Sequence, residues 1–353
     1  MSRKTNAFLV ASIASAIGFL SLSSCGAKAT DNDDTTPKPY TCNGTPATCL
    51  RLGSGWTYEG VILNMSQAGN GGPDPVVIRL DDGRYRLYYA VGDTPDDPDW
   101  WGMVSWISDD GLNFTKEAGY RFEGYTLFSH WIVRNPDGSF RMYWLDQKQG
   151  QVNAMGYAAV KSALSTDGGW TFIGEPGERL TFSGTGYETN GIGGGRVLLL
   201  ADGRFRMYYG GTSDYSRVLS AISTDGLSFT REAGVRLDKL CPPEGGAPGV
   251  TPFTDAQGAT HTFLWGTRCS GNYENSKAGL FDGMTADGLT LAIAGSPFVE
   301  GYSKDGTMST VVGPQDHTVV QTPQGLRVYF ILYGPGGMVS ETALYSVINT
   351  SIK

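Results

Sequence analysis

The sequence lacks a concentration of positive charge, has few histidines and contains no cysteine pair with C-x-x-C spacing. Its 353 residues carry 27 lysines and arginines against 35 aspartates and glutamates, which gives a formal net charge of −8 and a pI near 5.0. Because phosphate binding needs clustered Lys and Arg, nucleic acid is excluded as an expected partner. With three histidines and no C-x-x-C spacing, the sequence predicts no thiol-ligated metal site.

The sequence also lacks an apolar run that would span a membrane comfortably. Ala7–Leu20 is apolar but short, and it follows Arg3 and Lys4, a pattern typical of an export signal. Leu22–Cys25 then resembles the bacterial lipobox, which implies cleavage before Cys25 and lipidation of its thiol. Gly26 is not an aspartate, and this favours the outer membrane over inner-membrane retention. An ordinary signal peptide with a chance cysteine is the alternative.

Three segments are expected along the chain. Residues 1–24 are the lipoprotein signal peptide and residues 25–48 are a flexible tether, because Lys28–Thr48 has almost no large apolar side chain to bury. Residues 49–353 form the folded body. If Cys25 carries lipid, four cysteines remain in an oxidising compartment. The simplest of their three connectivities pairs Cys42 with Cys49 and Cys241 with Cys269.

A hairpin phrase recurs through the body, which is rich in glycine (50 residues) and in aromatic residues (12%). Each copy has an apolar strand, an Asp-Gly turn and an alternating aromatic strand, the signature of a β-hairpin. The three clear copies are Pro75–Tyr89, Trp131–Trp144 and Arg196–Tyr209, with weaker ones around Gly258 and Gly325. A second element, a tight turn closed by an Asp side chain, follows most hairpins. Its copies are Ser108–Thr115, Ser165–Phe172, Ser223–Thr230 and Thr285–Leu291.

One unit is therefore four strands over roughly sixty residues, and five units predict an all-β, five-bladed β-propeller with four-stranded blades. The fifth unit stops without an outer strand, whereas Gly55–Leu63 resembles an outer strand with no inner partner. We expect this N-terminal strand to complete the last blade and remove an open edge.

Function is sought where the innermost strands begin, because these strands line the axis and their preceding loops form one face of the ring. Blade one offers Asp74, and blade two offers Ser129 and His130. Blade three has Gly191–Gly195 with Glu188 upstream. The remaining candidates on this face are Glu244 of blade four and Asp316 and His317 of blade five, whereas His261 is predicted to be structural.

The Asp74–Val77 phrase and Gly313–Val320 resemble motifs of the five-bladed glycoside hydrolases of family 43 and their relatives. That resemblance implies a blade-one aspartate as base, a blade-two aspartate that tunes pKa, a blade-three glutamate as acid, and a last-blade histidine beside a central ion or water. Asp74 and His317 match. Ser129-His130 and the glycines of blade three depart from the pattern. A structural calcium at the axis is the candidate ion.

Cleaving a glycosidic bond needs two carboxyl groups, one ionised and one protonated, on opposite sides of the sugar. We expect Asp74 to be the base and Glu188 the acid, with Glu244 in reserve. Trp100, Trp101 and Trp131 are candidates for stacking on sugar rings, Trp100 and Trp101 from a long loop. Substrate contacts are further assigned to His130, Arg134, Asp316 and His317. Each has a structural alternative, such as a turn-forming aspartate, or Arg134 paired with a nearby acid.

The sequence thus predicts a cell-envelope lipoprotein that hydrolyses glycosidic bonds of oligo- or polysaccharides. A non-catalytic surface propeller that binds glycan or protein is the alternative. A third reading rests on Ser165–Phe172, which resembles the Asp-box of sialidases. Sialidases resemble six-bladed rings with an arginine triad, and neither pattern is found here.

Overall fold

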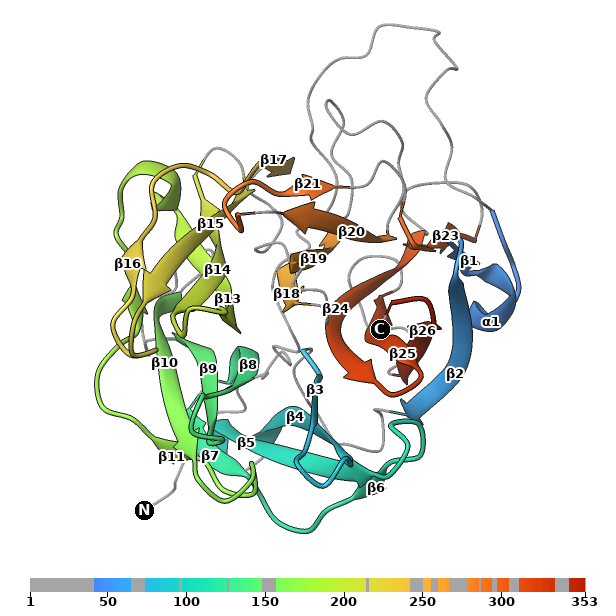
Figure 1. Cartoon of the computed structure of the whole chain (residues 1–353), viewed down its shortest axis with the longest axis horizontal. Coiled ribbons are helices and arrows are strands. Elements are labelled where there is room, and N and C mark those ends of the chain that lie inside the picture. Colours follow the sequence, from blue (N-terminus) through green and yellow to red (C-terminus); the bar gives the residue numbers. More distant parts are fainter. Residues whose placement is uncertain are drawn as a thin grey trace, which may run out of the picture.

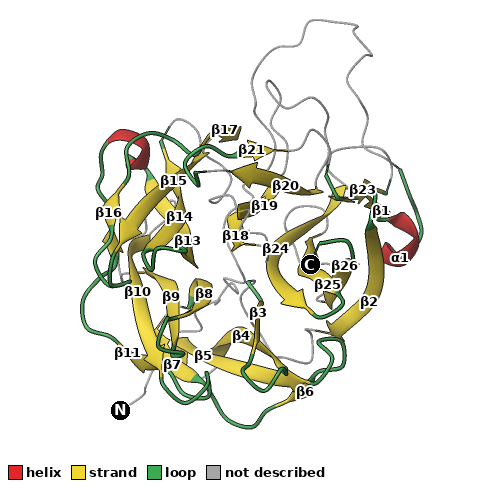
Figure 2. Ribbon diagram, viewed as in Figure 1, coloured by secondary structure: helices red, strands yellow, loops and turns green. Residues whose placement is uncertain are grey.

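The computed structural model describes residues 41–64, 74–94, 97–125, 127–147, 157–213, 216–241, 250–254, 260–266, 279–285, 287–293, 297–304, 311–333 and 343–352. These residues form five antiparallel sheets around a central axis, as Figure 1 shows in a view down the ring. The described chain is almost entirely strand and loop (Figure 2), with the helix α1 (Pro46–Cys49) and the 3-10 turn η2 (Gly186–Glu188) as short exceptions. The predicted five-bladed β-propeller is confirmed.

Each blade is built outward from the axis. The innermost strands are β3 Val76–Arg79, β8 Phe128–Arg134, β13 Gly191–Leu199, β18 Val250–Thr254 and β24 Val311–Thr322. The second strands are β4 Tyr85–Thr94, β9 Phe140–Gln147, β14 Phe205–Thr212, β19 Thr260–Gly266 and β25 Gly325–Tyr333. The third strands are β5 Asp97–Ser108, β10 Tyr157–Ser165, β15 Ser216–Ser223, β20 Gly279–Thr285 and β26 Ala343–Asn349.

The fourth strand of blades one to four is split into two short pieces that pair with the same third strand. These pieces are β6 Thr115–Lys116 and β7 Phe122–Tyr125, β11 Ile173–Gly174 and β12 Leu180–Thr181, β16 Thr230–Arg231 and β17 Leu237–Cys241, and β21 Ala292–Ile293 and β22 Val299–Glu300. In blade five, β2 (Trp56–Asn64) fills this place by pairing with β26. The predicted completion of the last blade by an N-terminal strand is confirmed.

The second strands explain why aromatic residues recur in the hairpin phrase. Alternate side chains of β4 point to opposite faces of the sheet, and both faces are covered by neighbouring blades. Leu87 and Tyr89 pack with Tyr329 of blade five, whereas Tyr88 packs with Tyr143 of blade two. Large flat side chains fill the space between adjacent sheets, so most of the core lies between blades.

The Asp-Gly turns join each blade to the one before it. Arg141 pairs with Glu175 within blade two, its Nη1 donates to the carbonyl of Asp225 at 3.0 Å, and the Tyr143 hydroxyl donates to that of Gly226 at 2.8 Å. A Cβ on Gly226 would lie 2.5 Å from Arg141 Nη1, and φ there is 71°, so the position requires glycine. Equivalent sets are Arg86, Glu117 and Tyr88 with Gly168 and Gly169; Arg206, Glu232 and Tyr208 with Asp287 and Gly288; and Arg327, Glu59 and Tyr329 with Asp110 and Gly111.

The junction between blades four and five is built differently. His261 and Phe263 stand where the other blades have the arginine and tyrosine, and β26 ends at Asn349 with no Asp-Gly turn after it. The N-terminal segment crosses this junction instead. Its strand β1 (Arg51–Leu52) pairs with β22 of blade four, and the following β2 pairs with blade five.

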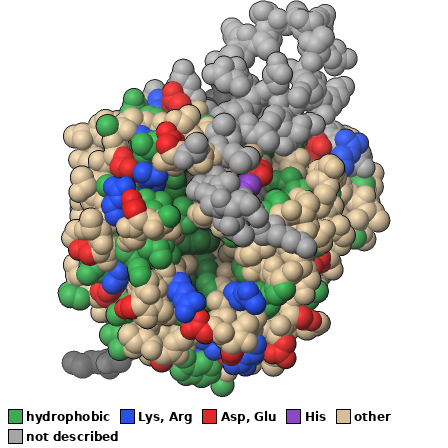
Figure 3. Space-filling model, in the orientation of Figure 1, with side chains coloured by type: hydrophobic (Ala, Val, Ile, Leu, Met, Phe, Trp, Pro, Cys, Tyr) green, Lys and Arg blue, Asp and Glu red, His purple; other side chains and the backbone are tan. Residues whose placement is uncertain are grey.

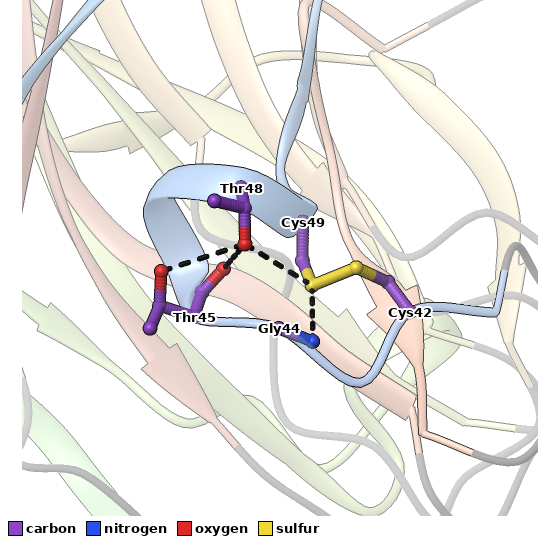
Figure 4. The surroundings of a disulfide bond; sticks show 5 residues. All are labelled: Cys42, Gly44, Thr45, Thr48 and Cys49. Carbon is purple, nitrogen blue, oxygen red and sulfur yellow. Dashed lines mark hydrogen bonds between the residues drawn. A yellow bond between two sulfur atoms is a disulfide. The ribbon is translucent and has the colours of Figure 1, made fainter.

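A disulfide holds the beginning of this crossing segment. Cys42 and Cys49 are bonded across α1 (Figure 4), which confirms the predicted pair. The Cys42 N–H donates to the Ser303 carbonyl at 2.9 Å, so the segment is attached to β23 (Tyr302–Ser303), which pairs with β24. Residues 41–48 were expected to belong to the tether, and here they contact the ring. None of the described helices has the length and apolarity needed to span a membrane.

Candidate active site at the propeller axis

Three strained residues mark equivalent places on the innermost strands or just before them. Among the described non-glycine residues, Asp74, Ser129 and Asp316 have positive φ angles, of 80°, 47° and 40°. Each lies two residues before the inner-strand residue that pairs with a tyrosine of the second strand, which is Tyr88, Tyr143 or Tyr329. Such conformations cost about 1–3 kcal/mol each and persist where the surroundings impose them. The backbone of blades one, two and five therefore adopts the same positive-φ conformation at the same place on the inner strand.

Asp74 is held by the blades on its side of the ring. Its side chain is buried, Oδ1 accepts a hydrogen bond from Arg196 Nη2 at 2.9 Å, and Oδ2 accepts one from the Ser129 N–H at 3.0 Å. Arg196 comes from β13 of blade three and is 4% exposed. A blade-one carboxylate is thus fixed by groups from blades two and three.

Arg196 organises the blade-two side of this site as well. Its Nη1 donates to the His130 carbonyl at 2.6 Å, and its guanidinium lies 5.1 Å from the centre of the Trp131 ring. The Trp131 indole N–H donates to the Val197 carbonyl at 2.9 Å. Trp131 therefore packs between blades, where its ring supports Arg196, and most of its surface is buried.

His130 is completely buried beside Asp74. Neither ring nitrogen makes a hydrogen bond of standard geometry to a described residue, although the backbone groups of Tyr88 and Leu127 lie next to the ring. Burial lowers the pKa of His130 to about 4, against an opposing effect from Asp74. The imidazole is therefore neutral near pH 7.

The glycines of blade three make room for this arrangement. The pairing of β13 with β14 shifts between Gly193 and Arg196, a bulge at the level of Ser129. A Cβ placed on Gly194 would lie 3.0 Å from Ser129 Cβ, so a side chain there would press on blade two. The stretch that departs from the family pattern thus lets Arg196 reach Asp74 of blade one.

Blade five contributes Asp316 and His317 at its own bulge in β24. His317 is buried, and its carbonyl accepts a hydrogen bond from Thr251 of blade four at 3.1 Å. Burial raises the pKa of the Tyr89 hydroxyl, and the charges of Asp316 and Asp74 raise it further. Both carboxylates therefore lie within electrostatic reach of one phenol, at the junction of blades five and one.

Glu188 lies in a different environment from the one expected of an acid. Its carboxylate accepts hydrogen bonds from Arg231 at 2.7 Å, from the Tyr209 hydroxyl at 2.8 Å and from the Ser183 N–H at 3.2 Å. Burial alone raises the pKa of Glu188, but these donors outweigh it and the pKa lies below its usual value. A general acid needs the opposite shift, so the geometry does not support the acid role predicted for Glu188.

Arg134 lies at the opposite end of its strand from His130. Its Nη2 is 2.5 Å from Asp81 Oδ1 at the blade-one hairpin turn, and both side chains are more than half exposed. This is the pairing with a nearby acid that the sequence left open, and it does not support the substrate contact predicted for Arg134.

The predicted loop carrying two tryptophans is instead strand. Trp100 and Trp101 both belong to β5, whose partner β4 continues to Thr94, because aromatic residues favour strands. The Trp101 ring lies over Gly92, where a Cβ would be 2.4 Å from it, and packs against the core. The Trp100 side chain lies outside the described residues.

Several predicted residues cannot be placed in the site. Glu244, Cys25 and Cys269 lie outside the described residues, as does the side chain of Cys241. Within the described part of the chain, no three His, Cys, Asp or Glu side chains are grouped as metal ligands. Asp316 and His317 alone do not complete a calcium site, so an axial calcium stays a prediction and no chemical step is derived through it.

Arg196 and Tyr89 were missed by the sequence analysis. A signal for Arg196 exists: it is the charged member of a set of aligned inner-strand positions whose others are Val76, Trp131, Thr251 and Thr318. A charge in a strand buried between blades needs a partner, and the partner is Asp74.

Figure 3 shows that the face seen in Figure 1 is hollowed near the middle of the ring.

Comparison with solved structures supports the fold. No protein-family model and no curated protein matches the chain. Among solved structures, a family 117 glycoside hydrolase of the marine bacterium Zobellia galactanivorans is 15% identical, with a TM-score of 0.56 over 84% of this chain and 90% of that one. A thermostable family-43 glycoside hydrolase is 14% identical, with a TM-score of 0.54 over 78% and 88%.

A protein of unknown function from Dyadobacter fermentans is similar to the same degree. It is 15% identical, with a TM-score of 0.55 over 85% of this chain and all of that one. The chain is therefore a five-bladed β-propeller with the fold that the family 43 and family 117 glycoside hydrolases share.

Proposed function

We propose that this chain acts on glycans and hydrolyses a glycosidic bond at the axial face of the ring. The observation that carries the proposal is Asp74, a strained and buried carboxylate that Arg196 of blade three and the Ser129 N–H of blade two hold in one position. Proteins tolerate such strain where it positions a functional group. Fold likeness to glycoside hydrolases favours this proposal over other hydrolytic chemistries.

Asp74 is suited to the role of the ionised carboxylate. Each of its oxygens accepts one hydrogen bond in the structure, and a carboxylate oxygen can accept two. One lone pair on each oxygen is thus left to take a proton from water or to attack carbon. Arg196 keeps the charge stable in a buried setting, where an unpaired carboxylate would be costly.

The second carboxyl group has two candidates after Glu188. Glu244, the reserve acid, lies outside the described residues. Asp316 shares the surroundings of Tyr89 with Asp74 and is partly exposed. Asp316 is therefore the candidate that we carry forward, and in this proposal blade five rather than blade three supplies the acid.

A non-catalytic glycan-binding propeller is the second candidate. It is favoured by the pairing of Glu188 with Arg231 and by the complete burial of His130, since both remove a titratable group expected at an axial site. The sialidase reading has no support in the fold, because the ring has five blades.

The test compares turnover of aryl glycosides and of arabino- and xylo-oligosaccharides by the wild type and four variants. Asp74→Asn is expected to lower kcat/KM by about 10²- to 10⁴-fold. Asp316→Asn or Glu244→Gln should do the same for whichever residue is the acid. Glu188→Gln is the matched control and should keep most of the activity of its folded fraction. No turnover by the wild type, together with measurable oligosaccharide binding, would favour the non-catalytic alternative.

We propose further that Cys25 is lipidated and anchors the ring to the cell envelope, in the outer membrane. The support is the lipobox-like Leu22–Cys25 after an apolar run. Metabolic labelling with a radioactive fatty acid should mark the wild type and leave Cys25→Ala unlabelled. Equal labelling of both proteins would contradict the anchor.

A further inference from the structure

We infer that Ser129 is a substrate-binding residue of the proposed axial site, and that Gly194 of blade three positions it. In this role the Ser129 hydroxyl forms a hydrogen bond with a hydroxyl of the bound sugar. The role rests on the proposed function, because it concerns the same site. It gives blade two a contact with substrate that the completely buried ring of His130 does not make.

Ser129 belongs to a set of equivalent positions on the inner strands or just before them. In blades one, two, three and five, these positions hold Asp74, Ser129, Gly194 and Asp316. Each lies two residues before the one that pairs with a tyrosine of the second strand, which is Tyr88, Tyr143, Tyr208 or Tyr329. In the order of the blades, Ser129 therefore stands between the carboxylate proposed as the base and a glycine.

The backbone of Ser129 has a conformation that serine rarely adopts. Its φ is 47°, in a region that glycine enters freely and that aspartate and asparagine tolerate better than most residues. A glycine here would relieve the strain and would still donate its N–H to Asp74. The hydroxyl is the group that a glycine would lack, and strain of this kind persists where a side chain has a function.

The hydroxyl of Ser129 is available to a ligand. Among the described residues, none forms a hydrogen bond with it, and Ser129 is half-buried. The buried serines of the third strands differ, since each donates to a glutamate at 2.6 Å; they are Ser105, Ser162 and Ser220. A serine hydroxyl can donate one hydrogen bond and accept others, which matches the hydroxyl of a sugar.

The place of the hydroxyl follows from its neighbours on both sides. Strands β8 and β13 lie side by side at the axis (Figure 1). A Cβ on Gly194 of β13 would be 3.0 Å from Ser129 Cβ and 3.1 Å from Ser129 Oγ, so this side chain lies between two innermost strands. The Ser129 nitrogen is 3.0 Å from Asp74 Oδ2, which keeps Oγ within about 7 Å of that oxygen. A sugar whose reacting carbon faces Asp74 therefore presents a ring hydroxyl near Ser129.

Gly194 is a positioning residue because its lack of a side chain makes room for that of Ser129. It is not among the described glycines with positive φ, so alanine would fit its backbone. The added Cβ would meet Ser129 at a distance that real Cβ atoms hardly ever show, and one of the two strands would have to move. Since the Ser129 N–H holds Asp74, that movement would also displace the carboxylate.

The first test uses the aryl glycoside that the wild type hydrolyses with the highest kcat/KM, together with analogues that each lack one ring hydroxyl. Ser129→Gly should raise KM by roughly three- to tenfold with little change in kcat, because it removes one neutral hydrogen bond and keeps the N–H to Asp74. For one analogue the increase should vanish, since that analogue lacks the partner hydroxyl. Ser228→Gly, at an exposed serine of blade three, is the matched control and should keep the wild-type KM.

The second test asks whether Gly194 acts through Ser129. Gly194→Ala should raise KM and also lower kcat by roughly ten- to hundredfold, because it displaces Asp74. Adding Ser129→Gly to Gly194→Ala should restore kcat and leave KM raised, since the clash disappears and the hydroxyl stays absent. The Tm of Ser129→Gly should equal or exceed that of the wild type, because glycine adopts this φ without strain.

The outcomes separate this role from the proposed hydrolysis. An active wild type whose KM is unaffected by Ser129→Gly would overturn the role of Ser129 and leave the axial function standing. An equal KM increase for every analogue, or a lower Tm for Ser129→Gly, would make Ser129 a structural residue. A wild type without turnover would refute the hydrolysis, and Ser129→Gly should then weaken the Kd for arabino- or xylo-oligosaccharides by the same three- to tenfold. Absence of wild-type binding as well would overturn both proposals.

Discussion

The Arg196 guanidinium of blade three lies 2.9 Å from the Asp74 carboxylate of blade one, although the two residues are 122 positions apart. Both side chains are at least nine-tenths buried, and the same arginine holds the His130 carbonyl of blade two. Three blades are thereby joined by one cation at the place where the axial site is proposed. The ion pair is therefore at once a part of the ring's structure and the feature that fixes Asp74.

Arg196→Gln should destabilise the protein strongly, because it leaves the Asp74 carboxylate buried without its partner. We expect a loss of about 3–5 kcal/mol in the free energy of unfolding, measured by urea denaturation. Arg204→Gln breaks an exposed pair with Asp202 and should cost less than about 1 kcal/mol. Combining Arg196→Gln with Asp74→Asn should cost less than the sum of the two single changes. An additive result would show that the two charges do not interact.

His130 should stay neutral across the physiological pH range. Its folded-state pKa of about 4 lies below the unfolded value of about 6.5, so the unfolded chain binds more protons between these values. The contribution of His130 to stability is therefore complete above pH 6.5 and is lost as the pH falls toward 4, by about 3 kcal/mol in total. NMR titration, with His130→Gln for assignment, should show no His130 midpoint between pH 5 and 8. A midpoint near 6.5 would contradict its burial.

The bonds between blades can be tested at Tyr143. Tyr143→Phe removes the hydroxyl that donates to the Gly226 carbonyl and leaves that acceptor buried. A loss of about 1–2 kcal/mol in the free energy of unfolding is expected. Tyr187→Phe alters an exposed tyrosine of blade three and is the control, with a change within about 0.5 kcal/mol. Equal effects of the two substitutions would argue against a structural role for the turn bond.

The disulfide should contribute more to stability than its short loop suggests. It holds the segment that crosses the junction of blades four and five, where His261 and Phe263 replace the arginine and tyrosine of the other junctions. Closing the loop between Cys42 and Cys49 is worth about 2–3 kcal/mol by chain entropy. Replacing both cysteines by serine should lower Tm and expose residues 41–64 to protease before the rest of the ring. Deleting residues 50–63 should go further and give aggregated protein, since blade five loses β2. An unchanged Tm and cleavage pattern for both variants would contradict the crossing segment as the closure of the ring.

The hairpins were predictable because their causes are local. An Asp-Gly turn between an apolar strand and an alternating aromatic strand specifies a hairpin within about fifteen residues, and the structure has β3 with β4 and β8 with β9 at those places. The missing outer strand of blade five also followed from counting strands. The loop predicted around Trp100 failed because its polar residues were given more weight than the strand preference of the tryptophans.

The candidate site was predicted only in part. Asp74, His130 and His317 were expected near the axis, and the structure places them on the innermost strands or just before them. Glu188 was expected to be an acid because it precedes the glycines, but Arg231, which pairs with it, comes 43 residues later in the chain. No local sequence pattern predicts an ion-pair partner that is 43 residues away along the chain.

The amino-acid sequence alone determined the number of blades, their turns and the closure by an N-terminal strand, because each of these depends on short-range patterns repeated about every sixty residues. The tertiary structure alone decided which charges meet, since closing the ring brings Arg196 to Asp74 and lays Trp170 on Arg121. The physical reason is that ion pairs and stacked rings depend on where sheets lie in space, whereas strands and turns depend on neighbouring residues.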